Sequence, residues 1–378
     1  PTPSSSRLQY RTMKITDVHC HHLSYPLQEP FANSRAWVHE RTAHVIEIHT
    51  DNGLVGWGEG TATMAARAIE SHLLGRDPFD SRRIWVDLAD QGWGNVAAIS
   101  AVDIALWDLQ GKAVGRPIYQ LLGGASRLKI PAYASGLFRR RRPDNTQALT
   151  AEAQGYVDAG FGAIKMKVGL GPQYDITNVA AIRQAVGDQT LFAVDANCSY
   201  DVATAIDVGR RLADYDLYWY EEPVAKNDVA GNLEVRQALQ GLRIAGGEQL
   251  QGLTAYRDLI SQRAFDIVQP DISIAGGFTE CQRIEALAQT HGLCVLPHMW
   301  GTAIRLAATA HWQATIPDDP EGLCPQPSLF EFDMTENGLR TELACEPILA
   351  TDGFVSVPEA PGLGIEIDRT VLERYAID

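Results

Sequence analysis

The sequence predicts an α/β protein: a (β/α)8-type, modified TIM barrel with an N-terminal α+β capping domain that the C-terminal segment completes. Two patterns predict this fold. Up to about residue 127, apolar residues first alternate as in antiparallel strands and then follow helical stripes. From Leu128 onward, short apolar strands alternate with helical stripes, and eight strands can be counted. Eight strands, each but the last followed by a helix, are what a barrel of this kind requires.

Composition and charge exclude several classes of protein. The 378 residues suffice for two domains or for one barrel with an appended domain. A hydrophobic content of 45% with 21% charged residues is typical of an ordinary soluble globular protein. The formal charge of -15 argues against nucleic acid or an anionic membrane as a partner. No apolar run approaches the roughly 18 to 20 residues of a membrane helix. Six scattered cysteines without zinc-type spacing favour a reducing cytoplasm.

Four segments are expected along the chain. Residues 1–12 are polar and are predicted to be an extension or a cloning remnant, residues 13–127 the capping domain, residues 128–333 the barrel, and residues 334–378 a segment that packs back on the capping domain. In the capping domain, Asp51-Asn52-Gly53 supplies a tight hairpin turn, and apolar spacing predicts a helix over 97–109. Residues 25–41 are long for a connection and are interpreted as a lid or binding loop, with Arg35 and Trp37 as candidate substrate contacts.

The barrel strands are expected at regular intervals. They are predicted over 130–135, 163–168, 191–197, 217–222, 244–248, 265–271, 294–300 and 329–333. In the second of them the alternation of apolar and charged residues puts Lys165 and Lys167 on one face. Two neighbouring ammonium groups disfavour each other's charged form and burial acts in the same direction, so one lysine could serve as a base near neutral pH. A solvated edge strand with both lysines exposed is the alternative.

Polar residues recur at the carboxyl ends of these strands, about one βα unit apart. They are Lys165, Lys167, Asp195, Glu221, Glu248, Asp271, His298 and Glu331. All should face one mouth of the barrel, which is where such barrels carry their active sites. The successive carboxylates of Asp195, Glu221 and Glu248 would repel one another, and a divalent cation resolves the conflict. Ligation by oxygen alone favours Mg²⁺ over zinc, whereas helix caps and exposed strand ends are the alternative reading.

The remaining polar positions suggest acid–base chemistry. Asp271 and His298 on neighbouring strands form a pair in which the carboxylate orients the imidazole and raises its basicity. Glu331 could stay protonated and donate a hydrogen bond to developing negative charge, or could form a plain salt bridge. Asn197 lies two residues after Asp195, hence on the same face, and could hold a substrate hydroxyl. Trp300 is a further candidate substrate contact.

Together these motifs resemble the enolase superfamily, in particular its mandelate racemase subgroup, the mandelate racemase/muconate lactonizing enzyme family. The motifs are 100–108 (SAVDIALWD), Gly111-Lys112, 121–124 (LLGG), the Lys-x-Lys pair, Val194-Asp195-Ala196-Asn197, Tyr220-Glu221-Glu222-Pro223, Gly247-Glu248, Gln269-Pro270-Asp271 and Pro297-His298. The resemblance covers nearly all of residues 13–378. It implies Mg²⁺ on the three carboxylates, Lys167 as one base with Lys165 beside it, the His298/Asp271 dyad on the opposite face of the substrate, and a homo-oligomer, an octamer or a dimer.

The expected reaction begins with removal of a proton α to a carboxylate. The resulting enediolate needs strong stabilisation, which the metal, Lys165 and Glu331 could provide. The motifs near the C-terminus look more like those of sugar-acid dehydratases and galactarolactone cycloisomerases, which favours β-elimination from a small anionic substrate, a sugar acid or its lactone. The alternatives are a racemase or epimerase of a 2-hydroxy acid, a Schiff-base aldolase and a non-catalytic binding protein. The resemblance assigns substrate choice to residues 25–41 and about 60–65, which do not translate into a particular substrate.

Overall fold

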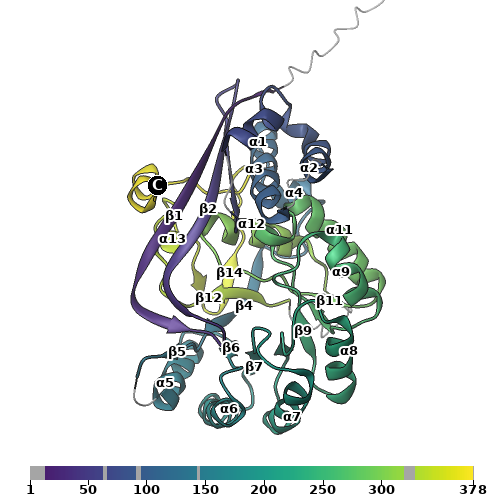
Figure 1. Cartoon of the computed structure of the whole chain (residues 1–378). Helices are drawn as coiled ribbons and strands as arrows, with labels where there is room; N and C mark the ends of the chain where they lie inside the picture. The colour runs from purple at the N-terminus through teal and green to yellow at the C-terminus, as the bar shows by residue number, and fades with distance from the viewer. Residues whose placement is uncertain (1–12, 63–65, 91–94, 143–144, 319–327, 378) are drawn as a thin grey trace, which may run out of the picture.

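The computed structural model describes residues 13–62, 66–90, 95–142, 145–318 and 328–377. A capping domain stands on one mouth of a barrel, and its longest hairpin runs down along the barrel (Figure 1). The predicted extension at residues 1–12 lies outside the described residues, as do residues 63–65 of the second predicted specificity segment. Within the part of the chain that is described, no helix has the length and apolar character needed to cross a bilayer.

The capping sheet is antiparallel, with the strand order β3-β2-β1-β5. Its strands are β1 (Ile15–Ala32), β2 (Trp37–Thr50), β3 (Val55–Gly60) and β5 (Arg139–Arg140). The turn between β2 and β3 falls where predicted, with Gly53 at φ 83°. The prediction of a loop over residues 25–41 is wrong, because β1 and β2 continue through it and leave only residues 33–36 as the tip. A shift of register between Pro26 and Phe31 lets β1 keep its prolines within the strand.

The capping domain contains the helices α1 (Ala66–Leu73), α2 (Ser81–Asp90), α3 (Val96–Val114) and α4 (Ile118–Leu121), with the short 3₁₀ helix η1 (Pro78–Asp80) before α2. Helices α1 and α3 lie on one face of this sheet, and the other helices of the domain pack against α3. Strand β3 lies directly on α3 because Gly56, Gly58 and Gly60 share one face, and a Cβ at Gly58 would lie 1.9 Å from the carbonyl oxygen of Ala101. The other face of β3, which carries Glu59, therefore turns toward the barrel.

Eight parallel strands form the barrel, in the order β11-β10-β9-β8-β7-β6-β4-β12. They are β4 (Lys129–Gly136), β6 (Ala163–Lys167), β7 (Leu191–Asp195), β8 (Tyr220–Glu221), β9 (Ile244–Gly246), β10 (Ile267–Val268), β11 (Cys294–Val295) and β12 (Phe330–Asp333). The helices around them are α5 (Asn145–Asp158), α6 (Pro172–Val186), α7 (Val202–Leu212), α8 (Val229–Ala238), α9 (Gly252–Ser261), α10 (Ile272–Ala275), α11 (Gly277–Thr290) and α12 (Ala303–Thr315), with the 3₁₀ helix η2 (Ala213–Tyr215) after α7. Each of the eight predicted strands is present, and several are shorter than predicted.

The barrel interior contains one buried cluster with a contribution from every strand position. Its members are Tyr133, Ala163, Ala193, Trp219, Ala245, Ile267, Leu296 and Leu329. No backbone ladder joins β11 to β12 in the described residues, but the backbone N–H of Met299, after β11, donates to Glu331 on β12 at 3.1 Å. Side chains thus bring the first and last strands of the row together, as the packed interior of such a barrel requires.

The segment after β12 returns to the capping sheet. It contains α13 (Gly338–Thr341), α14 (Arg369–Tyr375) and the hairpin of β13 (Ala350–Thr351) and β14 (Phe354–Ser356), which pairs with β4. Beside β1 and β2, Arg369 forms an ion pair with the buried Glu47, and the backbone N–H of Ile377 donates to the carbonyl oxygen of His22. The C-terminal segment therefore ties the two parts of the molecule together.

Candidate active site

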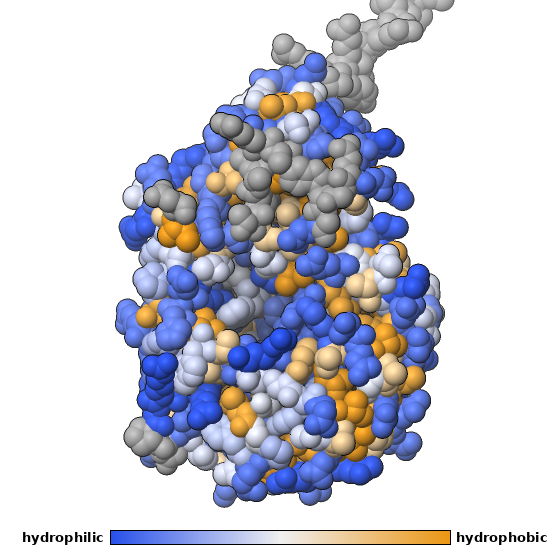
Figure 2. All heavy atoms as spheres, viewed as in Figure 1, coloured by the Kyte–Doolittle hydropathy of each residue, from blue (hydrophilic) through white to orange (hydrophobic). Residues whose placement is uncertain are grey.

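A cavity of about 300 Å³ lies at the carboxyl ends of the barrel strands, beneath the tip of the β1–β2 hairpin. It is lined by Asn33, Arg35, Thr61, Ser135, Phe138, Lys167, Asn197, Glu248, Gln249, Ile274, His298, Trp300, Arg305 and Glu331. The molecular surface is hollowed near the middle of the face in Figure 2, with mostly hydrophilic and neutral residues around the hollow. The cavity brings together residues from both the barrel and the capping domain.

The two lysines are buried between carboxylates. Strand β6 lies between β4 and β7, so the alternative of a solvated edge strand is wrong, and Lys165 and Lys167 are only 1% and 7% exposed. The Nζ of Lys165 lies 2.5 Å from Oε1 of Glu221 and 2.9 Å from Oε1 of Glu331. Lys167 forms an ion pair with Asp195, its partner in the register of β6 and β7.

These carboxylates control the protonation of the lysines. Burial disfavours the charged form, but Glu221 and Glu331 outweigh it and hold the pKa of Lys165 well above its ordinary value. Asp195 likewise raises the pKa of Lys167 against the effect of burial. The expectation that mutual repulsion lowers the pKa of one lysine toward neutrality is therefore wrong: the neighbouring carboxylates raise the pKa of both lysines. A cation held by the same carboxylates would offset the negative charge that keeps the lysines protonated.

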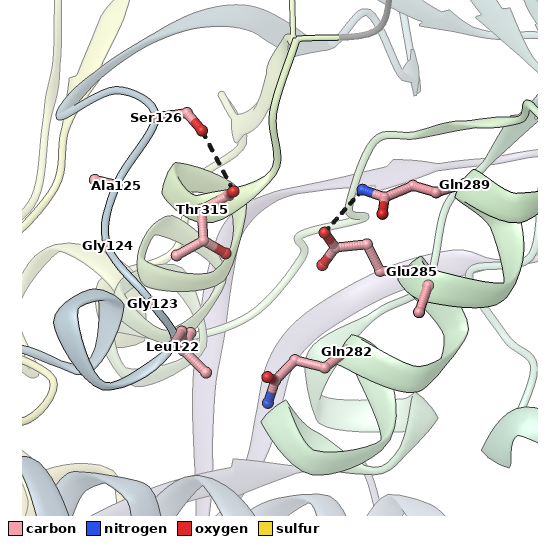
Figure 3. Close-up of a pocket in the computed structure, with 10 residues that line it drawn as sticks. Leu122, Gly123, Gly124, Ala125, Ser126, Gln282, Glu285, Gln289 and Thr315 are labelled. Atoms are coloured by element: carbon pink, nitrogen blue, oxygen red, sulfur yellow. Dashed lines mark hydrogen bonds between the residues drawn. The ribbon is translucent and has the colours of Figure 1, made fainter.

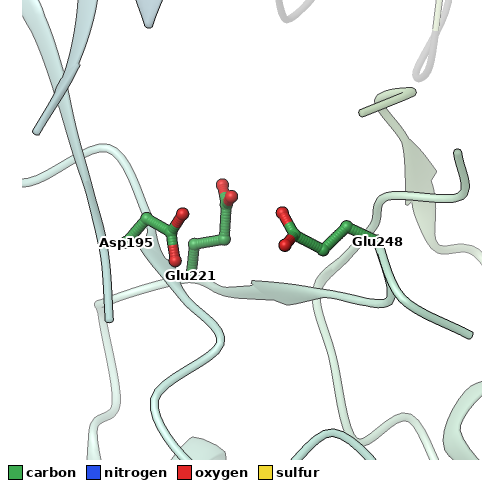
Figure 4. A group of neighbouring side chains, drawn as sticks. All are labelled: Asp195, Glu221 and Glu248. Atoms are coloured by element: carbon green, nitrogen blue, oxygen red, sulfur yellow. The ribbon is translucent and has the colours of Figure 1, made fainter. Parts of the chain in front are cut away.

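The carboxylates of Asp195, Glu221 and Glu248 point toward a common centre (Figure 4). All three are buried, and one oxygen of each lies within 4.8 Å of the others. Parallel pairing places Asp195 beside Glu221, while Glu248 follows β9, the next strand. The indole Nε1 of Trp219 and the amide Nε2 of Gln269 donate to Oε2 of Glu221 at 2.9 and 2.8 Å. This carboxylate is thereby fixed in orientation.

The electrostatics of this triad fit a divalent cation. Burial raises the pKa of Glu221 to about 7; Lys165 offsets part of this effect, while the charges of Asp195 and Glu248 add to it. Oε2 of Glu248 is buried and accepts no hydrogen bond. Three buried carboxylates that destabilise one another are the oxygen-only donor set that suits Mg²⁺.

The predicted histidine–carboxylate pair is present. Nδ1 of His298 lies 2.5 Å from Oδ2 of Asp271, and its Nε2 lies 3.2 Å from Oε2 of Glu248. Burial alone would lower the pKa of His298, but Glu248, Glu331 and Asp271 raise it to about 9. Arg305 also contacts Oδ2 of Asp271. The sequence reasoning missed Arg305 because this residue lies in α12 and not at the end of a strand.

Glu331 is ionised. Burial alone would raise its pKa, but Lys165, His298 and Lys167 hold it well below the ordinary value. Its oxygens accept hydrogen bonds from Ser135 Oγ at 2.8 Å and from the backbone N–H of Met299 at 3.1 Å. Of the two alternatives left open for Glu331, the structure favours the salt bridge over the protonated donor.

The four candidate substrate contacts divide into two groups. Arg35, Asn197 and Trp300 line the cavity, whereas Trp37 is not among its lining residues and lies under the guanidinium of Arg141, 4.6 Å from Cζ to the ring centroid. The backbone N–H of Asn197, at φ 45°, donates to Oδ1 of Asp195 at 2.7 Å. Asn33 and Thr61 fall within the segments 25–41 and about 60–65, to which the resemblance assigns substrate choice. Sequence reasoning missed four further lining residues: Ser135 of β4, Phe138, Gln249 and Ile274 of α10.

A second cavity, of about 510 Å³, lies away from these residues, between the segment 122–126 and α11 (Figure 3). The ionisable side chain in its wall is Glu285, which already accepts hydrogen bonds from Trp312 Nε1 at 2.8 Å and from Gln289 Nε2 at 3.0 Å. Its described lining brings no base or group of metal ligands together. The charged cavity at the barrel mouth is therefore the candidate active site.

The fold and this charged mouth define the class, the capped (β/α)8-barrel enzymes. Residues 15–123 match the mandelate racemase/muconate lactonizing enzyme N-terminal domain, and residues 148–371 match the enolase C-terminal domain-like family. The chain therefore belongs to the mandelate racemase/muconate lactonizing enzyme family of the enolase superfamily, as its motifs predict.

Two relatives and two solved structures extend this result. D-galactarolactone cycloisomerase of Agrobacterium fabrum is 40% identical over 96% of this chain and 99% of its own length, and arabinonate dehydratase of Saccharolobus solfataricus is 33% identical over 87% and 89%. The 3,6-anhydro-D-galactonate cycloisomerase of Zobellia galactanivorans superposes with a TM-score of 0.84 at 34% identity, covering 97% of this chain and 100% of that one. A racemase of Streptomyces coelicolor A3(2) with bound magnesium superposes with a TM-score of 0.84 at 30% identity, covering 96% of this chain and 100% of that one.

Proposed function

We propose that this protein is a Mg²⁺-dependent enzyme that removes the proton α to the carboxylate of a sugar acid or its lactone and then expels the β-oxygen. The observation that carries the proposal is the meeting of a buried carboxylate triad, a lysine and a histidine at one cavity. Relatives that are cycloisomerases of a galactarolactone and dehydratases of sugar acids support it.

Mg²⁺ would be held by Asp195, Glu221 and Glu248. The chemistry that the ion supplies is polarisation of the substrate carboxyl group, which offsets the negative charge left when the α-proton departs. Beside this site, the ammonium group of Lys165 adds a fixed positive charge. The oxygen Oδ1 of Asn197 is buried without a hydrogen-bond partner and could accept from a substrate hydroxyl.

Lys167 and His298 are the two candidate bases. The uncharged form of either can accept the α-proton, on Nζ or Nε2, while the electron pair of the C–H bond moves into the carboxyl group to give an enediolate. Asp271 holds Nδ1 of His298, which leaves Nε2 as the atom that faces the reaction. The other member of the pair, in its protonated form, then donates to the leaving oxygen.

The same elimination explains both dehydration and cycloisomerisation. The electron pair of the enediolate forms a carbon–carbon double bond, the bond from the β-carbon to its oxygen breaks, and the enol product tautomerises to a 2-keto acid. When the β-oxygen is a hydroxyl, it leaves as water after protonation. When it is the ring oxygen of a lactone, the ring opens and the product is an isomer of the substrate.

The substrate is expected to be a small anion with several hydroxyl groups. Arg35 at the hairpin tip supplies positive charge, and Trp300 supplies an aromatic surface. Nε1 of Trp300 and Nε of Arg305 are buried donors without a partner in the protein. A racemase or epimerase of a 2-hydroxy acid would need the same two bases, so it remains the second candidate, which the bound-magnesium racemase supports.

The test is a screen of aldonates, aldarates and their lactones with Mg²⁺, read by a 2-keto-acid assay and by NMR. Release of a 2-keto acid supports elimination, whereas inversion at the α-carbon without a keto acid supports racemisation. A borohydride-trapped adduct with pyruvate or a ketose would instead indicate the Schiff-base aldolase. Failure of every substrate both to release a 2-keto acid and to exchange its α-hydrogen would contradict the proposal.

Three wider expectations belong to the same proposal. We propose that residues 13–127, 128–333 and 334–378 act as capping domain, barrel and closing segment. We also propose a homo-oligomer, an octamer or a dimer, for which light scattering is the test. A cytoplasmic location agrees with Cys20, Cys198, Cys281 and Cys345, which are free thiols in the described part of the chain.

A further inference from the structure

The loop that follows β11 carries His298 and Trp300 and leads into α12, which carries Arg305. The ladder between β10 and β11 ends at Val295. Beyond it, the loop is joined to the barrel by an isolated bridge between Asp271 and His298 and by the hydrogen bond from the backbone N–H of Met299 to Glu331. By contrast, Lys167 and Asp195 lie within a continuous ladder. Contacts from outside the barrel can therefore add to what holds the histidine side of the site.

The capping domain supplies such a contact through Glu59. This residue of β3 is 2% exposed. Its carboxylate accepts hydrogen bonds from the backbone N–H of Thr302 at 3.1 Å, from Thr302 Oγ1 at 2.5 Å and from the backbone N–H of Arg305 at 3.1 Å. The carboxylate of Glu59 thus accepts hydrogen bonds from the N-cap residue and from the first turn of α12, although Arg305 is 246 residues away in the sequence.

The first N–H groups of a helix have no partner within the helix and need an acceptor. Thr302 is the N-cap of α12, and its hydroxyl accepts from the backbone N–H of Ile304. In a capping box, a glutamate inside the helix returns to the N-cap N–H. Here Glu59 takes that role from another domain.

The place of Glu59 is set by packing on both sides. Behind it, the glycines of β3 allow the strand to lie on the backbone of α3, as described above. In front of it, a Cβ at Gly301 would lie 2.5 Å from Oε1 of Glu59. Little room is left for the carboxylate of Glu59 to move. Its hydrogen bonds therefore fix the position of the start of α12.

From α12 the contact continues to the dyad. Arg305 contacts Oδ2 of Asp271, the oxygen that also holds Nδ1 of His298, and its Nη1 donates to the carbonyl oxygen of Trp300 at 3.0 Å. We propose that Glu59 is a positioning residue that holds the His298–Asp271 dyad in its reactive geometry through α12 and Arg305. The proposal rests on the proposed function only in taking the dyad as an acid–base group.

The test compares Glu59→Ala, Glu59→Gln and the control Glu47→Ala. Glu47 is also a buried carboxylate of the capping sheet, but its partners His21, His49 and Arg369 lie outside the cavity lining. Glutamine keeps an acceptor for the start of α12, whereas alanine leaves Thr302 and Arg305 without one. Because a displacement of about 1 Å can cost about 10²-fold, we expect turnover to fall about 10- to 100-fold in Glu59→Ala and less in Glu59→Gln, with KM little changed.

A second readout does not depend on any substrate. The ring N–H proton of His298 beside Asp271 gives an NMR signal that is identified by its loss in His298→Asn. We expect it to shift or broaden in Glu59→Ala and to stay unchanged in Glu47→Ala. If Glu59→Ala does not fold, Thr302→Val tests the same contact with a smaller change.

An unchanged signal in the folded Glu59→Ala or Thr302→Val protein would overturn the positioning role, as would an equal change in Glu47→Ala. Equal loss of turnover in Glu59→Gln and Glu59→Ala would also overturn it, because the charge and not the hydrogen bonds would then matter. A shifted signal in a protein that acts on no sugar acid would instead leave the positioning role standing and contradict the proposed function.

Discussion

Replacing Asp103 by asparagine should remove a pH-dependent loss of stability. Asp103 lies in α3 at 2% exposure, and its carboxylate accepts from Thr279 Oγ1 at 2.5 Å and from the backbone N–H of Thr279 at 3.0 Å, at the start of α11. Burial raises the pKa of Asp103 from 3.8 to about 7, against the hydrogen bonds from Thr279. An amide in its place can accept from the N–H and donate to the hydroxyl, but it does not titrate.

The sign of the effect follows from the proton that the folded state retains. Between the two pKa values the unfolded chain has lost this proton and the folded protein has not, so the free energy of unfolding falls as pH rises. A pKa that moves from 3.8 to about 7 corresponds to about 4 kcal/mol at about 1.4 kcal/mol per pH unit. The contribution of Asp103 is thus fully present below pH 3.8 and lost by about pH 7.

The assay is urea unfolding of the wild type and Asp103→Asn between about pH 4 and pH 8. We expect the wild-type free energy of unfolding, relative to that of the variant, to fall by about 4 kcal/mol up to about pH 7 and then to stay constant. The same substitution at the exposed Asp80 controls for the chemical change. A difference that stays constant over the whole range would refute the reasoning, because Asp103 would then be ionised in the folded protein.

Three further substitutions probe other parts of the molecule. Glu248→Gln should weaken Mg²⁺ binding in a calorimetric titration and cost several kcal/mol of transition-state stabilisation, and full activity in excess EDTA would contradict the metal site. Gly58→Ala should lower stability by about 1–3 kcal/mol in thermal unfolding, because its Cβ meets Ala101; unchanged stability would refute the close packing of β3 on α3. Arg41→Ala should cost about 3–5 kcal/mol in urea unfolding, since it leaves the buried Asp333 unpaired; a loss below 1 kcal/mol would show that the pair is not needed.

The barrel and its charged rim could be predicted from the sequence because both depend on local patterns. Alternation along 163–168 is enough to place Lys165 and Lys167 on one face. Parallel strands in register bring their carboxyl ends to one rim, so one polar residue per βα unit predicts that Asp195, Glu221 and Glu248 meet. Family membership was predictable for the same reason, since these motifs occur at fixed spacings.

Features that depend on long-range contacts could not be predicted. No local sequence pattern predicts the contact of Glu59 with Thr302 and Arg305. The length of residues 25–41 suggested a loop, but β1 and β2 continue through this segment, with a register shift between Pro26 and Phe31. Trp37, inside the same segment, consequently points to Arg141 instead of lining the cavity.

Protonation was the least predictable property. Reasoning from the two lysines alone lowers their pKa values, whereas the carboxylates that surround them in space raise both. Whether Glu331 is protonated likewise depends on the position of Lys165, His298 and Lys167. A pKa reflects every charge within a few ångströms, and the sequence does not state which charges those are.

The measurement that tests the central claim most directly is exchange of the substrate α-hydrogen with D₂O in Lys167→Ala and His298→Asn, in the presence of Mg²⁺. If the two residues divide the work, loss of the abstracting base abolishes exchange, and loss of its partner stops net turnover while exchange persists in part. General acid–base assistance is typically worth about 10²- to 10⁴-fold, so the two defects should be distinct. Near-full turnover in both variants would contradict the two-base site.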